Sequence, residues 1–194
     1  MKRVINLDNW NRKEHFKFFS ALDDPFWGIT TTVDFTSIYQ QSKNMEVSFF
    51  LYSVHFLLKC INATTAFKLR IGREDGTFGF GFFEYDTDLS LFIENAEKEI
   101  HRVKNSTGLS FSKDTARADV IRYSALPWFA FSEMKHAGSI QTGDSIPKIS
   151  TGKLIQEKKK LLLPISISVH HGLVDGRNVA EFIQNVKDGQ NNTL

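Results

Sequence analysis

Hydrophobic and polar residues recur with two different periods along the chain, which predicts a mixture of helices and strands. Helical spacing covers residues 12–21, 47–63, 88–104 and 177–187. Asp8 or Asn9 is expected to cap the first helix, whose buried side would carry Trp10, Phe16 and Phe19. The other predicted helices are long enough to cover one face of a sheet.

Strand patterns fill much of the remaining chain. Residues 29–35 are rich in β-branched side chains, and 68–71 and 77–83 flank an Asp75-Gly76 turn. Residues 119–131 also have strand character, and 148–156 and 161–170 flank a polar turn, which predicts a hairpin. Aliphatic and polar residues alternate over 165–170, as they do in a strand with one buried face.

The order of these elements predicts the fold class. Helices interleave unevenly with strands that are mostly antiparallel, which favours an α/β two-layer sandwich with a mixed, mostly antiparallel sheet. A Rossmann fold is less compatible, because the chain has no glycine-rich phosphate loop. With 194 residues, no internal repeat and no low-complexity linker, residues 1–194 are expected to form one domain.

Composition excludes several classes of protein. A net charge of +2 gives no support for nucleic-acid binding. The single cysteine, Cys60, excludes an intrachain disulfide and is expected to be a small buried residue. No apolar run reaches the roughly 18 residues of a membrane span, and the N-terminus has no signal-peptide pattern. We therefore expect a cytoplasmic protein without a membrane partner.

The segment His170-His171-Gly172-Leu173-Val174-Asp175-Gly176 carries the clearest chemical signal. Adjacent strand residues point to opposite faces, so both histidines are not expected to bind one metal ion. The spacing is also a poor zinc signature, and no metal is expected. The residues alone leave two interpretations open: a catalytic histidine, or a strand-to-helix turn in which Asp175 caps a helix.

Three further segments accompany this motif. They are Asn9-Trp10-Asn11-Arg12-Lys13-Glu14-His15-Phe16, Ser124-Ala125-Leu126-Pro127-Trp128, and Pro147-Lys148-Ile149-Ser150-Thr151-Gly152-Lys153 followed by Leu162-Leu163-Pro164. Together and in this order, the four segments resemble the chloramphenicol acetyltransferase family, within the CoA-dependent acyltransferase superfamily, over most of the chain. The resemblance implies the fold of that family and acetyl-CoA as co-substrate.

The resemblance also implies catalytic roles. His171 would be the general base that deprotonates the acceptor hydroxyl, and His170 its structural neighbour. Ser124 would stabilise the oxyanion of the tetrahedral intermediate. Asp175 would pair with Arg12 to organise the site rather than relay a proton. Ser150 would hold an ordered water, although the family often has threonine at this position.

Other residues are assigned to binding. Lys153 is expected to approach a CoA phosphate, or to be an ordinary exposed lysine. Trp128 is expected near the pantetheine channel, or in the core. Phe26 and Trp27 would form part of the acceptor-pocket wall. The resemblance further implies a homotrimer with sites between subunits, and a role in antibiotic resistance.

The resemblance is weakest between residues 66 and 76, where the chain looks about a dozen residues short. This is either a natural shortening or a stretch missing from the sequence. The acceptor implied by the family is chloramphenicol, but this region lies on the acceptor side in the family. Two alternatives therefore remain: the same chemistry on another alcohol or an amine, or a non-catalytic CoA-binding trimer.

Overall fold

A computed structural model describes residues 5–61, 66–117, 119–137 and 143–191. A seven-stranded sheet with the order β1-β7-β5-β4-β2-β3 runs through its centre, and β6 pairs with β7 outside this path. β4 runs parallel to both of its neighbours, and the other pairs are antiparallel. The predicted mixed, mostly antiparallel sheet is thus confirmed. The strands are β1 (Phe26–Asp34), β2 (Ala66–Gly72), β3 (Phe78–Glu84), β4 (Ile121–Ala125), β5 (Lys148–Thr151), β6 (Ile155–Glu157) and β7 (Lys160–His170).

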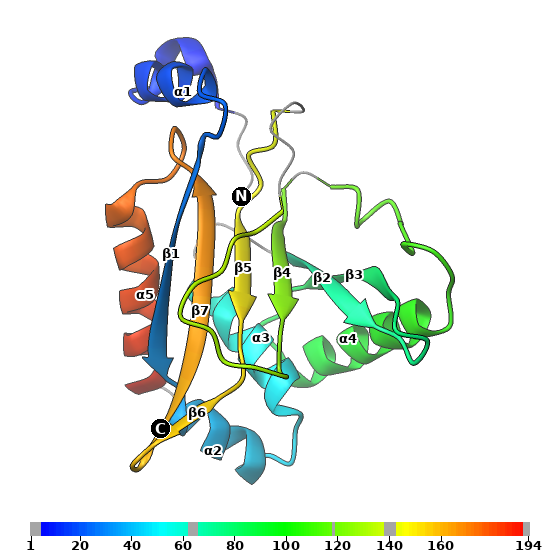
Figure 1. Ribbon diagram of the computed structural model, residues 1–194. Coiled ribbons are helices and arrows are strands. Elements are labelled where there is room, and N and C mark those ends of the chain that lie inside the picture. The colour runs from blue at the N-terminus through cyan, green and yellow to red at the C-terminus, as the bar shows by residue number, and fades with distance from the viewer. Residues whose placement is uncertain (1–4, 62–65, 118, 138–142, 192–194) are drawn as a thin grey trace.

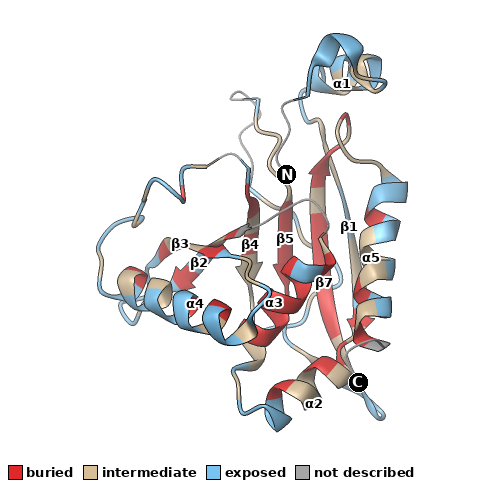
Figure 2. Cartoon of the chain, turned by 180° about the vertical axis from the view of Figure 1, so that it is seen from behind, coloured by how far each residue is buried: buried red, intermediate tan, exposed pale blue. Residues whose placement is uncertain are grey.

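Helices form the second layer on one face of this sheet. α3 (Phe49–Cys60), α4 (Leu89–Lys104) and α5 (Gly176–Asn191) lie across that face (Figure 2), and α2 (Thr36–Asn44) lies at one end. α1 (Lys13–Ser20), preceded by the short 3₁₀ helix η1 (Leu7–Asn9), lies beyond the opposite end, beside the turn that follows β7 (Figure 1). The two-layer architecture predicted from the sequence is confirmed, and within the described residues no helix covers the second face of the sheet.

The core lies between the sheet and the helices. On β7, Leu163, Ile165, Ile167 and Val169 are buried in the same hydrophobic cluster as residues of α3 and α5. Burial of each such side chain contributes about 1.5–3 kcal/mol, which fixes the register of β7 because a one-residue slip would expose all of them. The alternate residues, Ser166, Ser168 and His170, therefore point toward the helix-free face.

Cys60 is buried at the end of α3, as predicted. Burial raises the pKa of its thiol to about 11, so the thiol is protonated at neutral pH. Within the described residues, none of the helices combines the length and the apolar composition that a membrane crossing requires.

Several element boundaries differ from the predictions. Residues 36–44 form α2, which the sequence pattern did not reveal. β1 begins at Phe26, three residues earlier than predicted. The proposed cap of the first helix is wrong, because Asp8 and Asn9 lie in η1 and α1 begins after Arg12 without a side-chain cap. The predicted helix over 47–63 ends at Cys60, and residues 62 and 63 lie outside the described residues.

β2 and β3 form a closed hairpin at the place where the chain looked short. Arg73 N donates to Thr77 O at 2.9 Å, and Gly76 takes a positive φ of 81°, which glycine adopts without strain. Asp75 Oδ1 accepts from Thr77 N at 2.9 Å and completes the turn. The described chain is continuous over residues 66–117, and residues 73–77 connect β2 to β3.

The segment that follows β4 crosses the helix-free face of the sheet (Figure 1). The strand predicted over 119–131 is only Ile121–Ala125, and Trp128 and Phe129 lie beyond it. Trp128 is 73% exposed, so the prediction that it could be a core residue is wrong.

Candidate active site

A row of hydroxyl side chains crosses the helix-free face of the sheet. Ser124 on β4 pairs with Ser150 on β5, and Ser150 pairs with Ser166 on β7. Thr30 on β1 continues the row, because it pairs with Ser166. Ser150 is fully buried and Ser124 is half-buried. The structure therefore brings together two of the residues predicted for the site, Ser124 and Ser150, which are 26 residues apart in sequence.

His136 lies against this row and was not identified from the sequence. Its Nε2 is 3.0 Å from Ser150 Oγ, and either atom can donate, depending on the tautomer. Burial lowers the pKa of His136, and the positive charges of Lys148 and Arg70 lower it further. The ring is therefore neutral at pH 7 and able to donate through one nitrogen and accept through the other.

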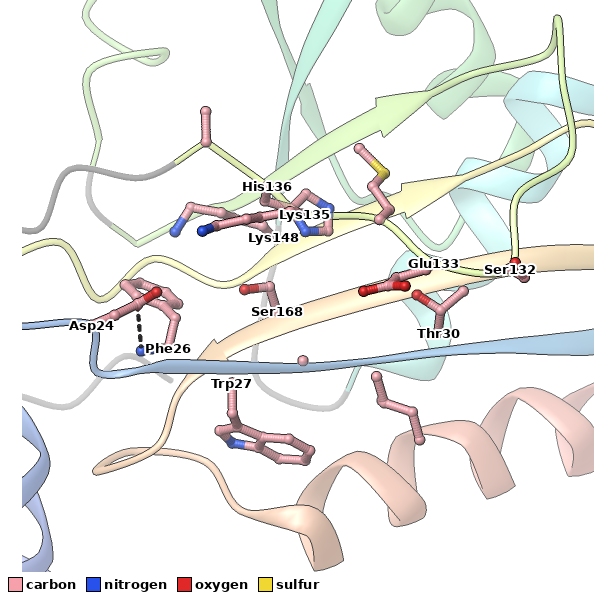
Figure 3. Close-up of a pocket in the computed structure, with 14 residues that line it drawn as sticks. Asp24, Phe26, Trp27, Thr30, Ser132, Glu133, Lys135, His136, Lys148 and Ser168 are labelled. Carbon is pink, nitrogen blue, oxygen red and sulfur yellow. Dashed lines mark hydrogen bonds between the residues drawn. The ribbon is translucent and has the colours of Figure 1, made fainter.

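Two cavities open on the helix-free face. One, of about 540 Å³, is lined by Ser124 and by residues of β2, β3 and β5. The other, of about 700 Å³, is lined by Phe26, Thr30 and Ser168 (Figure 3). Residues 134–137 and Lys148 line both, so His136 forms part of the wall between them. The volumes are within the range of sites for small molecules.

A buried ion-pair cluster lies at the start of β5. Asp144 Oδ2 accepts from Arg122 at 2.8 Å and lies 3.3 Å from Lys148 Nζ. The Lys148 ammonium also lies 3.5 Å from the centroid of the Phe26 ring, a cation–π contact. Burial lowers the pKa of Lys148, and the negative charge of Asp144 offsets part of this effect. Neither Asp144 nor Lys148 was singled out by the sequence analysis.

His171 lies in an aromatic enclosure at the end of β7. Its ring stacks on that of Phe19 from α1, with centroids 4.1 Å apart, and its centroid lies 5.5 Å from that of the Trp27 ring. Its backbone N donates to Pro25 O at 2.9 Å. Nδ1 is buried, and no hydrogen-bond partner reaches it within the described part of the chain. These contacts fix the orientation of the imidazole.

His170 points the other way. Its ring lies between Phe16 and Phe26, and its Nδ1 accepts from Gly172 N at 3.1 Å. Burial lowers the pKa of His170, so the ring is neutral. A Cβ atom on Gly172 would lie 2.8 Å from Phe16 Cα, so only glycine lets α1 approach this turn so closely. His170 thus supports the turn from the face opposite His171.

Arg12 and Asp175 form an ion pair with an N–O distance of 2.8 Å, and Arg12 Nη2 also reaches His171 O at 3.4 Å. Asp175 Oδ1 accepts from the backbone N of Arg177 and Asn178 at the start of α5. The hydrogen bond from Arg12 and those from the backbone lower the pKa of Asp175. Asp175 therefore both caps α5 and pairs with Arg12.

Phe26 and Trp27 lie on opposite sides of β1. Phe26 lines the larger cavity, whereas the Trp27 indole extends toward α5, away from Thr30 and Ser168 (Figure 3). Trp27 Nε1 donates to Val174 O at 3.0 Å. The Trp27 side chain therefore anchors the turn that carries His171, and Trp27 is also among the residues that line the larger cavity.

His171 and Ser124 are not brought together within one chain. Ser124 lies on the helix-free face, whereas His171 contacts Trp27 on the helix side of the sheet edge. Lys153 and Trp128 are exposed and lie just beyond the ends of β5 and β4. Among the residues that the structure describes, no three His, Cys, Asp or Glu side chains are placed to hold a metal ion.

Comparison with known proteins points to one family. The family model described as chloramphenicol acetyltransferase matches residues 2–80 and 70–187. Chloramphenicol acetyltransferase 3 of Escherichia coli is 26% identical over 98% of this chain and 97% of its own length. A solved structure of a chloramphenicol acetyltransferase covers 98% of this chain and 100% of its own, with a TM-score of 0.86 and 25% identity. A probable dihydrolipoamide acetyltransferase from Listeria monocytogenes, 10% identical with a TM-score of 0.66 over 99% of this chain and 94% of its own, shares the fold.

Proposed function

The chain belongs to the chloramphenicol acetyltransferase family, and we propose that it transfers the acetyl group of acetyl-CoA to a hydroxyl group of a small acceptor in a ternary complex. Acetyltransferase chemistry is supported by the relatives that match along nearly the whole chain. The observation that carries the proposal is the fixed orientation of His171 together with the row of hydroxyls that includes Ser124.

His171 acts as the general base. It takes the proton of the acceptor hydroxyl as the oxygen attacks the thioester carbonyl carbon, which forms a tetrahedral intermediate with a negatively charged oxygen. Ser124 Oγ donates a hydrogen bond to that oxygen. When the intermediate collapses, the C–S bond breaks and the CoA thiolate takes the proton back from the His171 imidazolium. No protein nucleophile or metal ion is required by this sequence of steps.

The two catalytic residues come from different copies of the chain. His171 lies at the helix side of the sheet edge and Ser124 lies on the opposite, helix-free face, so the two residues of one chain do not face each other. A closed ring in which one copy supplies His171 and the next supplies Ser124 satisfies this geometry. A homotrimer with three equivalent sites is the assembly that we propose.

Supporting residues hold the two halves of the site. The Arg12–Asp175 pair ties the segment before α1 to the turn that carries His171. Ser150 and His136 lie beside Ser124, where their hydroxyl and imidazole can bind a water or the acceptor. Lys153 and Trp128 lie at the ends of β5 and β4, where they can meet the phosphates and the pantetheine arm of acetyl-CoA.

Steady-state assays test the proposal. The purified protein is incubated with acetyl-CoA and either chloramphenicol or a panel of other alcohols and amines, and CoA thiol release is measured. We expect His171→Ala to lower the rate by about 10²–10⁴-fold, the usual contribution of a general base, with the oligomer mass unchanged. His101→Ala, a change at an exposed histidine on α4, is the matched control. Equal rates for His171→Ala and the parent protein would show that the base is wrongly assigned.

The identity of the acceptor is a more specific part of the proposal than the acetyl transfer itself. Chloramphenicol is the acceptor that the names of the relatives give. Another alcohol is favoured by one observation, the cationic residues around the Ser124 cavity. A non-catalytic CoA-binding trimer would bind acetyl-CoA but release no thiol with any acceptor in the panel.

A further inference from the structure

The cavity beside Ser124 is strongly cationic. No acidic side chain is among the described residues that line it. Asp144 neutralises part of the charge of Arg122 and Lys148, but no carboxylate is within ion-pair distance of Lys68, Arg70 or Lys135 in the described part of the chain. The cationic residues that line the cavity are Lys68, Arg70, Arg122, Lys135 and Lys148.

An apolar aromatic wall accompanies these charges. Phe80 and Phe111 stack with their centroids 5.5 Å apart and their planes 12° from parallel. The Lys68 ammonium lies 4.6 Å from the Phe80 ring and 5.0 Å from the Phe111 ring. Burial lowers the pKa of Lys68, and the neighbouring charge of Arg122 lowers it further. A bound anion would relieve this repulsion between like charges.

Two of the cations lie on the same strands as the serine hydroxyls of the site. Arg122 and Lys148 are two residues before Ser124 and Ser150 on the same strands and on the same face. At about 3.3 Å per residue, the Cα atoms of each cation and its serine are about 7 Å apart along the strand. Lys153 follows Ser150 in the opposite direction, so the proposed CoA end and the cationic end lie on either side of the hydroxyl row.

We propose that the acceptor carries an anionic group, a carboxylate or a phosphate, on a planar apolar frame. This inference rests on the function proposed above and names the substrate class of the same site. A neutral acceptor such as chloramphenicol would leave Lys68 and Arg70 without a counter-charge. A charge-assisted hydrogen bond at such a site is stronger than a neutral one, so the anion contributes directly to selectivity.

A matched pair of small alcohols tests the proposal. 4-(Hydroxymethyl)benzoate and 4-(hydroxymethyl)benzamide have the same shape and differ in charge. Titration calorimetry with the parent protein is expected to give at least about tenfold tighter binding of the benzoate, equivalent to about 1.4 kcal/mol. Lys68→Met and Arg70→Met are expected to remove most of that difference, whereas Lys187→Met, a change at an exposed lysine on α5, leaves it intact.

Steady-state kinetics distinguish the two anions that could occupy this cavity, the anionic group of the acceptor and the phosphates of CoA. Lys68→Met is expected to lower kcat/KM for the benzoate about tenfold, with KM for acetyl-CoA unchanged. A loss that falls on acetyl-CoA instead would assign the cavity to CoA phosphate and overturn the inference. Equal binding of the two alcohols, binding of neither, or a preference that survives both substitutions would also overturn it. A protein that binds the benzoate as expected but releases no thiol contradicts the proposed function and leaves the anion site standing.

Discussion

Replacement of Asp144, the carboxylate of the buried ion-pair cluster, should lower the stability of the folded protein. Its side chain and that of Lys148 are each only 4% exposed, and Arg122 is 38% exposed. Asp144→Asn leaves the buried Lys148 ammonium without a carboxylate. Removing one partner of a buried pair costs about 3–5 kcal/mol. Because Arg122 reaches solvent and the Phe26 ring still contacts Lys148, we expect a loss of about 2–3 kcal/mol in the free energy of unfolding.

Urea and thermal denaturation at a fixed protein concentration measure this loss. For a chain of this length, 1 kcal/mol shifts Tm by about 2–4 °C, so Asp144→Asn should lower Tm by about 4–12 °C. The double variant Asp144→Asn with Lys148→Met removes both charges and should recover most of the stability. An unchanged Tm for the single variant, or a double variant less stable than the single one, would refute the reasoning.

The same pair predicts a pH dependence. Burial by itself would raise the pKa of Asp144, but the backbone hydrogen bond from Ile146 and the charges of Lys148 and Arg122 outweigh it and hold the pKa below its usual value. The stabilisation is therefore complete above the unfolded pKa of about 3.9 and is lost as the pH falls through the lower folded value. The difference in stability between the parent and Asp144→Asn should shrink below about pH 4.

Three further predictions concern catalysis. Ser124→Ala should lower kcat by about 10²–10³-fold with little change in Tm, because the hydroxyl acts mainly in the transition state; a change in KM alone would contradict this role. Trp27→Phe removes the hydrogen bond to Val174 O and should cost about 1 kcal/mol of stability while lowering kcat, and an unaltered kcat would show that the turn does not need this anchor. Chelators should leave activity unchanged, and loss of activity that zinc restores would overturn the metal-free mechanism.

The layer architecture could be predicted because local periodicity determines which side of each strand is buried. On β7 the alternation of Ile165, Ser166 and Ile167 identifies the core face from sequence alone. α2 was missed because residues 36–44 are mostly polar, and Ile38 and Ser42 are the buried members of that helix. Because only these two residues of the helix are buried, its sequence shows no clear helical repeat of hydrophobic positions.

The candidate site was only partly predictable, because its neighbours depend on strand order and on an irregular segment. Ser124 and Ser150 meet through a parallel pairing that no local pattern encodes. His136 and Asp144 lie between β4 and β5, where there is no periodicity to assign a face. The hydrogen bond from Trp27 to Val174 could not be predicted, because the strand was predicted to begin at residue 29, which left the direction of the Trp27 side chain undetermined.

Mixing two inactive variants tests most directly whether each site uses His171 of one copy and Ser124 of another. His171→Ala and Ser124→Ala are unfolded together, refolded at a one-to-one ratio and assayed for thiol release with acetyl-CoA and an accepted alcohol. In a closed ring with random assembly, about a quarter of the sites receive both intact residues, so about a quarter of the parent activity should return. A mixture no more active than either variant alone, from hybrids of confirmed oligomer mass, would contradict the shared site.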